Sequence, residues 1–254
     1  MKVYFLGTGT SQGIPVIGSH HSVCLSDDLK DKRLRVSVWV HDDENSVVID
    51  CGPDFRQQML TSKCTKIDAI LFTHEHSDHT AGIDDIRPFN FRQGEIPIYA
   101  HKRVIKNLQK RFDYVFETEN KYPGAPSVKA IEVSNNKDFA IGNFKVTPID
   151  AMHGNLQVFG FRINDFAYLT DVKTIASEEV EKIKGVKVLV INALREELHH
   201  SHFSLQDALD FVTLVQPEKT YLTHISHLLG FHEEVQKKLP KNVFLAYDNL
   251  EILI

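Results

Sequence analysis

The feature that most constrains this chain is a histidine-rich motif directly after an apolar segment, Ala69–Phe72. If that segment is a strand that continues in extended form, the side chains of His74 and His76 point to the same side. Asp78 and His79 then fall on the turn into a helix, close enough to bind a neighbouring metal. Imidazole nitrogens and carboxylates are ligands for zinc, manganese and iron. A lone His-x-His is weak evidence, but His-x-His-x-Asp-His at the end of a strand predicts a metal site.

Short β-rich runs alternate with helical patterns along the whole chain. The predicted strands are Val3–Leu6, Val36–Val40, Ser46–Ile49, Ala69–Phe72, Ile96–Tyr99, Phe144–Ile149, Val158–Ile163, Phe166–Leu169 and Val186–Ile191. The predicted helices are Asp54–Leu60, Lys102–Arg111, Ser177–Ile183, Leu205–Leu214 and His232–Leu239, with Ser204 as an N-cap. Strand hairpins mixed with crossover helices indicate an α/β fold, an αββα sandwich formed by one domain over residues 1–254.

Composition narrows the classes of function. The formal net charge is −5 at pH 7, so the chain has no overall basic surface for nucleic acid beyond nucleotides. No apolar run reaches the length of a bilayer-spanning helix, which predicts no membrane partner. The N-terminal segment lacks the pattern of a signal peptide, and the three cysteines form no spaced disulfide framework. We therefore expect a cytoplasmic protein.

The histidine motif resembles that of the metallo-β-lactamase superfamily, whose fold is a four-layer αββα sandwich with the metals at one sheet edge. Later candidate ligands occur in suitable contexts: His153 and Asp171 follow predicted strands, and His224 ends the short β-rich run 221–224. The resemblance implies two divalent ions, zinc or manganese, with iron as a further candidate. It implies that His74, His76 and His153 hold one ion, that Asp78, His79 and His224 hold the other, and that Asp171 bridges them. Such a carboxylate suits the phosphodiesterase and thioesterase branches better than true β-lactamases.

Two further stretches, Gly7–Pro15 and Gly82–Pro88, look like the PhnP-like cyclic phosphodiesterase branch, which is related to tRNase Z. This resemblance implies a phosphodiesterase that hydrolyses small cyclic or nucleotide-like phosphodiesters through a metal-bound hydroxide. Asp78 is then catalytic, and a histidine protonates the leaving alkoxide, which needs a positioned acid. His202 fits this role best, and His199 is the alternative. The expected partner is a small phosphate ester, and homodimer formation is also implied.

PhnP-like proteins also have a structural zinc site near the N-terminus. In this chain Ser19 stands at the first cysteine position and His21 at the second, while Cys24 and a late histidine, His227, match the pattern. Serine is a poor zinc ligand, so His21, Cys24 and His227 are the candidates, with His20 as a fourth. A weakened zinc site and a metal-free loop are both open.

Other interpretations stay open at this point. Processing of RNA 3′ ends would need a surface that binds tRNA, and no long basic arm is inserted in the chain. Thioester or lactone hydrolysis uses the same ligands in other branches, and a non-catalytic metal-binding protein is a different class altogether. Among individual residues, Asp50 is either a support for a metal ligand or a turn former. Arg87 is either a phosphate ligand or part of a surface ion pair.

Three features are open to plainer interpretations. Lys102, Lys106 and Lys110 fall on one helical face, which is typical of a solvated stripe. Cys51 and Cys64 are expected to be buried. The aromatic segment from Phe112 to Val128 is either a packed connection or a cap beside the site.

Overall fold

Two seven-stranded sheets, both mixed parallel and antiparallel, form the centre of the computed structural model, which describes residues 1–254. The first sheet has the order β14-β1-β2-β3-β4-β5-β6 and the second β13-β12-β11-β10-β9-β8-β7. The strands of the first sheet are β1 (Lys2–Gly7), β2 (Ser37–His41), β3 (Ser46–Ile49), β4 (Ala69–Leu71), β5 (Ile96–His101), β6 (Val128–Val133) and β14 (Glu251–Leu253). Those of the second are β7 (Phe139–Ile141), β8 (Phe144–His153), β9 (Leu156–Ile163), β10 (Phe166–Leu169), β11 (Val188–Asn192), β12 (Lys219–Thr223) and β13 (Val243–Leu245).

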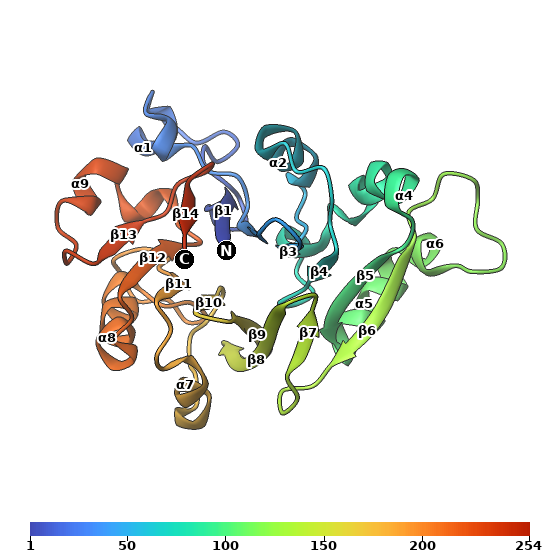
Figure 1. Ribbon diagram of the computed structural model, residues 1–254. Coiled ribbons are helices and arrows are strands. Elements are labelled where there is room, and N and C mark those ends of the chain that lie inside the picture. Colours follow the sequence, from blue (N-terminus) through green and yellow to red (C-terminus); the bar gives the residue numbers. More distant parts are fainter.

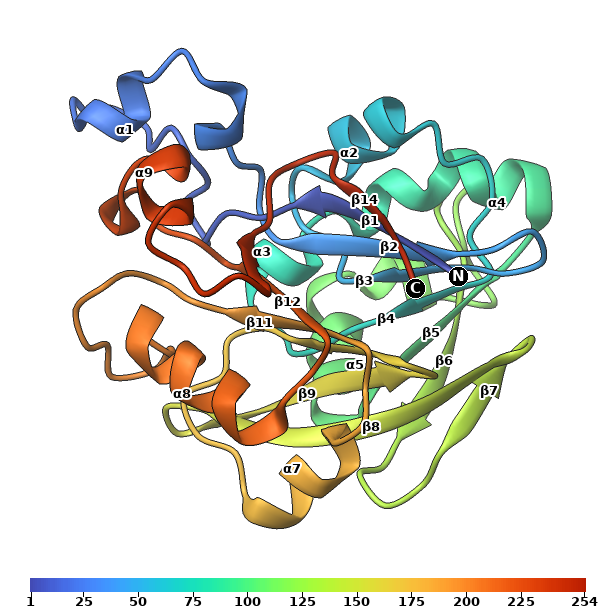
Figure 2. The same ribbon diagram turned by 60° about the vertical axis from the view of Figure 1, so that its left-hand side comes forward.

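Helices cover the outer face of each sheet, as Figures 1 and 2 show from two directions. The first sheet carries α2 (Phe55–Ser62), α4 (Arg87–Gln93) and α5 (Lys102–Arg111), and the second carries α7 (Ser177–Ile183) and α8 (Leu205–Val215). Shorter helices are α1 (Ser22–Leu25), α3 (Ser77–Thr80), α6 (Asp113–Phe116) and α9 (His232–Gln236). Single 3-10 turns are η1 (Leu29–Asp31), η2 (Ile83–Ile86) and η3 (His227–Leu229). The predicted four-layer αββα architecture is confirmed.

Three apolar clusters separate the layers. One of 21 buried residues lies between the sheets, one of 20 lies under α2, α4 and α5, and one of 23 lies under α7 and α8. Strand β3 shows how the sequence serves two clusters at once, because side chains alternate along a strand. Val47 and Ile49 enter the cluster between the sheets, whereas Val48 packs beneath the helices. A strand buried on both faces therefore needs the uninterrupted apolar run found here.

The strand ends that matter for function meet at one edge of the sandwich. Strands β3 to β6 run parallel to one another, as do β10 to β13. A backbone hydrogen bond from Phe159 N to Thr73 O, 3.0 Å long, joins the loop after β4 to the second sheet. The chain ends also lie together, since Ile254 N donates to Met1 O at 3.0 Å. None of the helices is long and apolar enough to span a bilayer.

All nine predicted strands are present, with ends shifted by up to four residues, and the helix over Lys102–Arg111 has the predicted bounds. The other five strands, β6, β7, β12, β13 and β14, are not among the predicted nine. Three of them have only three residues, too few for an alternating pattern to stand out. The segment from Phe112 to Val128 contains α6 and packs through Val115, which is fully buried. Tyr114 Oη donates to Asp84 Oδ1 at 2.9 Å, which favours a packed connection.

Candidate metal centre

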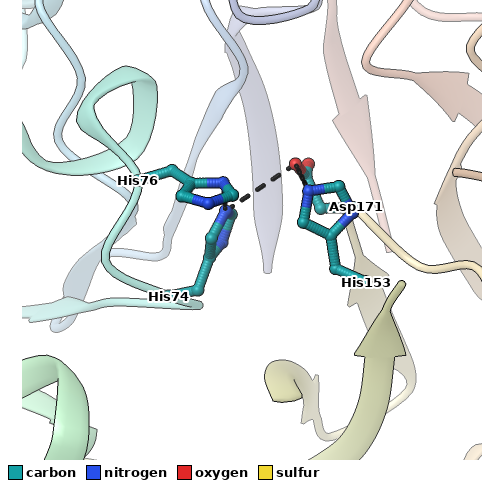
Figure 3. A group of neighbouring side chains, drawn as sticks. All are labelled: His74, His76, His153 and Asp171. Carbon is teal, nitrogen blue, oxygen red and sulfur yellow. Dashed lines mark hydrogen bonds and ion pairs between the residues drawn. The ribbon is translucent and has the colours of Figure 1, made fainter. Parts of the chain in front are cut away.

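The first group of candidate ligands comes from both sheets. After β4 the chain leads through Thr73 to His76, whose backbone is extended (φ −60°, ψ 151°). His74 Nε2 lies 3.0 Å from His76 Nδ1, so the two rings face the same side. His153 ends β8 and Asp171 follows β10. In Figure 3 the two pairs lie on opposite sides and point toward each other. One ligand atom from each of the four residues lies within 4.8 Å of all the others.

The second group shares Asp171 with the first. Asp78 and His79 lie on α3, and His224 directly follows β12; with Asp171 their ligand atoms again lie within 4.8 Å of one another. Asp171 turns its two oxygens to different partners. Oδ2 lies 3.7 Å from His74 Nε2, whereas Oδ1 lies 3.1 Å from His224 Nε2 and 3.5 Å from His79 Nε2. This is the arrangement that a carboxylate bridging two cations requires.

Several ring nitrogens at this centre lie near carboxylate oxygens without forming a hydrogen bond of ordinary geometry. His79 Nε2 and both ring nitrogens of His224 are buried and make no hydrogen bond. A buried polar atom without a partner costs about 1–3 kcal/mol, so such atoms are uncommon unless a ligand satisfies them. Nitrogen and carboxylate donors without a thiolate suit zinc, manganese and iron alike. The residues therefore fit a pair of divalent cations.

The ionisation of the ligands also suits cation binding. Burial, helped by the charge of His79, holds the pKa of His74 well below its ordinary value, so that ring is neutral. Burial by itself would raise the pKa of Asp171, but the neighbouring His224 and His79 hold it well below the ordinary value. Burial would likewise lower the pKa of His79, but Asp78 and Asp171 raise it. A cation would replace the proton that these carboxylates attract to His79.

Partners outside the ligand groups fix two of the rings. His79 Nδ1 lies 2.7 Å from Asp50 Oδ2, and both side chains are fully buried. Thr73 N and Thr73 Oγ1 also donate to Asp50. His153 Nδ1 lies 2.7 Å from Ser201 O, which as a carbonyl oxygen can only accept. Both contacts leave Nε2 facing the ligands, which is the usual outer support of a metal site.

Three residues at the centre have a left-handed backbone. Asp50, Asp171 and His224 have φ angles of 66°, 59° and 55°, and each lies within two residues of a strand end. This region is strained for residues other than glycine and is found preferentially at functional sites.

The candidate acid, His202, lies between the two ligand groups. Its ring centroid is 4.4 Å from that of His153 and 4.8 Å from that of His224. The side chain is buried, and Nδ1 makes no hydrogen bond. Burial lowers the pKa of His202 to about 2, and the charge of Asp171 offsets this only in part. His199 lies farther out, half-buried, with its ring centroid 5.1 Å from that of His202.

The structural zinc site does not fit this chain. The rings of His21 and His227 lie 5.0 Å apart, but His21, Cys24 and His227 do not bring three ligand atoms within 4.8 Å of one another. His21 Nδ1 instead accepts a hydrogen bond from Val23 N at 3.3 Å and caps α1. His20 is exposed and adds no fourth ligand to a group. Of the two alternatives that the sequence left open, this geometry favours the metal-free loop, because Ser19 and His21 both accept hydrogen bonds within the local turn.

The remaining candidates have ordinary surroundings. Arg87 Nη2 pairs with Asp84 Oδ2 at 2.5 Å, which is the surface ion pair. The lysines at 102, 106 and 110 are exposed, and Cys51 and Cys64 are buried. Sequence reasoning missed Ser201, and a backbone carbonyl carries no signal that could have found it.

Comparisons with known proteins agree with this geometry. Residues 45–225 match the family model described as beta-lactamase superfamily domain. A Porphyromonas gingivalis protein named octanoyltransferase is 40% identical over 256 residues, which cover 100% of this chain and 52% of that protein. A Bacillus subtilis protein named ribonuclease Z is 29% identical over 170 residues, covering 65% of this chain and 49% of that protein. The chain thus spans about half the length of these relatives.

A solved structure also superimposes over the whole chain. The crystal structure of a diphosphatase from the PhnP family matches with a TM-score of 0.92 and 36% sequence identity. The match covers 100% of this chain and 97% of that one.

Proposed function

We propose that this chain, which belongs to the metallo-β-lactamase superfamily and is a metal-dependent hydrolase of that fold, hydrolyses small phosphodiesters. One observation carries the proposal: two groups of nitrogen and carboxylate donors share the single carboxylate of Asp171. A pair of cations so placed suits in-line displacement at phosphorus, where attacking and leaving oxygens both need stabilisation. The likeness to a PhnP-family diphosphatase supports chemistry at phosphorus.

Each ligand group would hold one divalent ion, zinc, manganese or iron. His74, His76 and His153 would hold the first, Asp78, His79 and His224 the second, and Asp171 would contact both. When bound, the ions supply positive charge for the phosphoryl oxygens and lower the pKa of water. Asp78 is half-buried in the second group, so its carboxylate could contact a bound cation and would still face the solvent side of the site.

His202 would donate the proton that an alkoxide leaving group needs. Its ring lies beside one ligand of each group, so it can reach an oxygen held between them. Without substrate, burial keeps the imidazole neutral, because the pKa is lowered to about 2. An anionic phosphate in contact with the ring would favour the protonated form, as opposite charges do at short range. Binding of the phosphate would thereby favour protonation of His202, the acid that the reaction needs.

Names of relatives suggest two other substrates. Ribonuclease Z would point to RNA, but the formal charge of −5 provides no overall attraction for a polyanion. The octanoyltransferase name would point to acyl transfer, yet this chain covers only 52% of that protein and its three cysteines are all buried. Neither observation favours acyl or RNA chemistry over small phosphodiesters.

A substrate panel tests the proposal. Protein reloaded with zinc or manganese is assayed on bis(p-nitrophenyl) phosphate, 2′,3′-cyclic nucleotides, a dinucleoside diphosphate, precursor tRNA and an octanoyl thioester. We expect turnover of the small phosphate esters that is lost in Asp78→Ala. Turnover confined to the thioester or to the tRNA would overturn the proposed substrate class.

A further inference from the structure

Helix α5 reaches the metal-binding motif through an arginine that the metal site itself does not use. Arg103 forms a two-pronged ion pair with Glu75: Nε lies 2.8 Å from Oε1, and Nη2 lies 3.0 Å from Oε2. Glu75 stands between His74 and His76, and neighbouring side chains of an extended segment point to opposite sides. The pair therefore holds the back of the segment whose front carries two ligands.

The same guanidinium also contacts the second sheet. Arg103 Nη2 donates to Gln157 O at 2.5 Å, and Nη1 donates to Gln157 Oε1 at 3.3 Å. Gln157 pairs with Met152 across the β8–β9 hairpin, one residue before His153. The side chain of Arg103 thus joins the loop after β4 to the β8–β9 hairpin, in which His153 is the last residue of β8. These two segments supply all three histidines of the first ligand group.

A second arginine at the other end of α5 secures the rest of the loop. Arg111 Nη1 donates to Glu75 O at 2.8 Å and to Thr80 Oγ1 at 3.0 Å. Arg111 Nη2 donates to Ser77 Oγ at 3.1 Å. Helix α5 therefore contacts the turn from Glu75 to Thr80 at both of its ends, through Arg103 and Arg111.

The second ligand group has a different support. Its His79 is fixed by Asp50, which belongs to the segment after β3 and does not contact Arg103. Arg111 contacts the α3 turn that carries Asp78 and His79, so α5 as a whole serves both groups. The contacts of Arg103, by contrast, go only to Glu75 and Gln157, beside the histidines of the first group.

We propose that Arg103 is a positioning residue for the first cation: through Glu75 and Gln157 it sets the distance between the two segments that carry His74, His76 and His153. This inference goes beyond the substrate class and rests on the proposed two-cation site. Arginine suits the task because its planar fork of five donors can serve a carboxylate and a carbonyl together. A lysine at this position has the charge but not the fork.

The test measures binding of zinc by the metal-free protein in a calorimetric titration competed with a chelator. His153→Ala, which removes a ligand of the first group only, identifies the first-cation step. We expect Arg103→Lys and Glu75→Gln each to weaken that step by about 10–100-fold, the usual cost of losing an outer support, and to leave the other step unchanged. Lys106→Ala, an exposed position on the same helix, is the matched control and should leave both steps unchanged.

Thermal unfolding of the metal-free variants separates positioning from general stability. Positioning predicts melting temperatures close to that of the metal-free wild type, with the difference appearing once zinc is added. If Arg103→Lys and Glu75→Gln bind zinc as wild type does in both steps, or lose affinity equally in both, the role of Arg103 is overturned. The proposed function would still stand. A wild-type protein that takes up no zinc, manganese or iron would overturn the proposed function itself.

Discussion

The carbonyl of Ser201 accepts a hydrogen bond from His153 Nδ1 at 2.7 Å, so the residue before His202 also fixes a candidate metal ligand. One loop therefore serves both the first ligand group and the candidate acid. The position of His202 relative to the cations is then determined by backbone geometry, not by a flexible side chain. Such preorganisation is what proton transfer to a leaving group requires.

His202→Ala should slow substrates with alkoxide leaving groups far more than substrates that release p-nitrophenolate. A positioned acid contributes about 10²–10⁴-fold in rate, but only where the leaving group needs a proton. The comparison is kcat/KM for 2′,3′-cyclic AMP against bis(p-nitrophenyl) phosphate. His199→Ala is the control, because its ring lies beside those of His200 and His202 and not beside a candidate metal ligand. Equal losses on the two substrates would remove His202 from this role.

Asp50→Asn should weaken binding of the second cation. The variant keeps the size of the side chain but loses the charge that holds His79 Nδ1 at 2.7 Å. We expect about 10–100-fold lower affinity in the step that His224→Ala abolishes. Asp68→Asn, a carboxylate that pairs with Lys66 away from the centre, serves as the control. If chelator competition shows the same affinity in Asp50→Asn as in wild type, the support assigned to Asp50 is wrong.

The histidine at position 232 should make the fold sensitive to acid. Burial, then the charges of Arg33 and Lys30, lower the pKa of His232 from 6.5 to about 4, against the opposing effect of Asp28 and Asp31. Between these two pH values His232 is protonated in the unfolded chain but not in the folded chain. The free energy of unfolding therefore falls as pH drops from about 6.5 toward 4.

His232→Asn should therefore flatten this dependence. The measurement is the free energy of unfolding in urea at pH 7.5 and pH 5.0, on metal-free protein. Other histidines contribute equally to both proteins, so the difference in slope belongs to His232. Identical slopes for variant and wild type would contradict the lowered pKa.

Ser204→Ala should lower the free energy of unfolding by about 1 kcal/mol. Ser204 Oγ accepts from Asp207 N at 3.2 Å, and Asp207 Oδ2 accepts from Ser204 N at 3.0 Å, a reciprocal cap of α8. Ser204→Gly should cost only a few tenths of a kcal/mol, because glycine is tolerated at the N-cap position and buries no extra group. Ser177→Ala, at an exposed position on α7, is the comparison. A loss no larger than that of the comparison variant would show that the cap contributes nothing.

The strands and candidate ligands that could be predicted from sequence are those determined by short, local stretches of the chain. The apolar runs of β3 and β4 and the adjoining histidine motif are local signals, and the structure brings His74 to His79 together with His153, Asp171 and His224 as expected. Contacts between distant segments have no such signal. The sequence offered Asp50 as a support for a metal ligand, but it did not identify His79 as its partner. The pairing of Arg103 with Glu75 and Gln157 depends on how α5 packs against both sheets.

The structural zinc site is an alternative that the sequence could not decide, for a related reason. It depended on matching His21, Cys24 and His227 to a spacing, whereas ligand binding depends on where the donor atoms point. His21 turns its Nδ1 to the backbone of α1, and no group of three donors forms there. A spacing match therefore has little weight once two of the original ligand types have been replaced.

The most direct test of the account is turnover of bis(p-nitrophenyl) phosphate as metal is added back to stripped protein. The two ligand groups that share Asp171 predict activity that rises with zinc or manganese and reaches its maximum at two equivalents per chain. Asp171→Asn should abolish that rise. Full activity at one equivalent, or activity that survives complete removal of metal, would contradict the two-cation site.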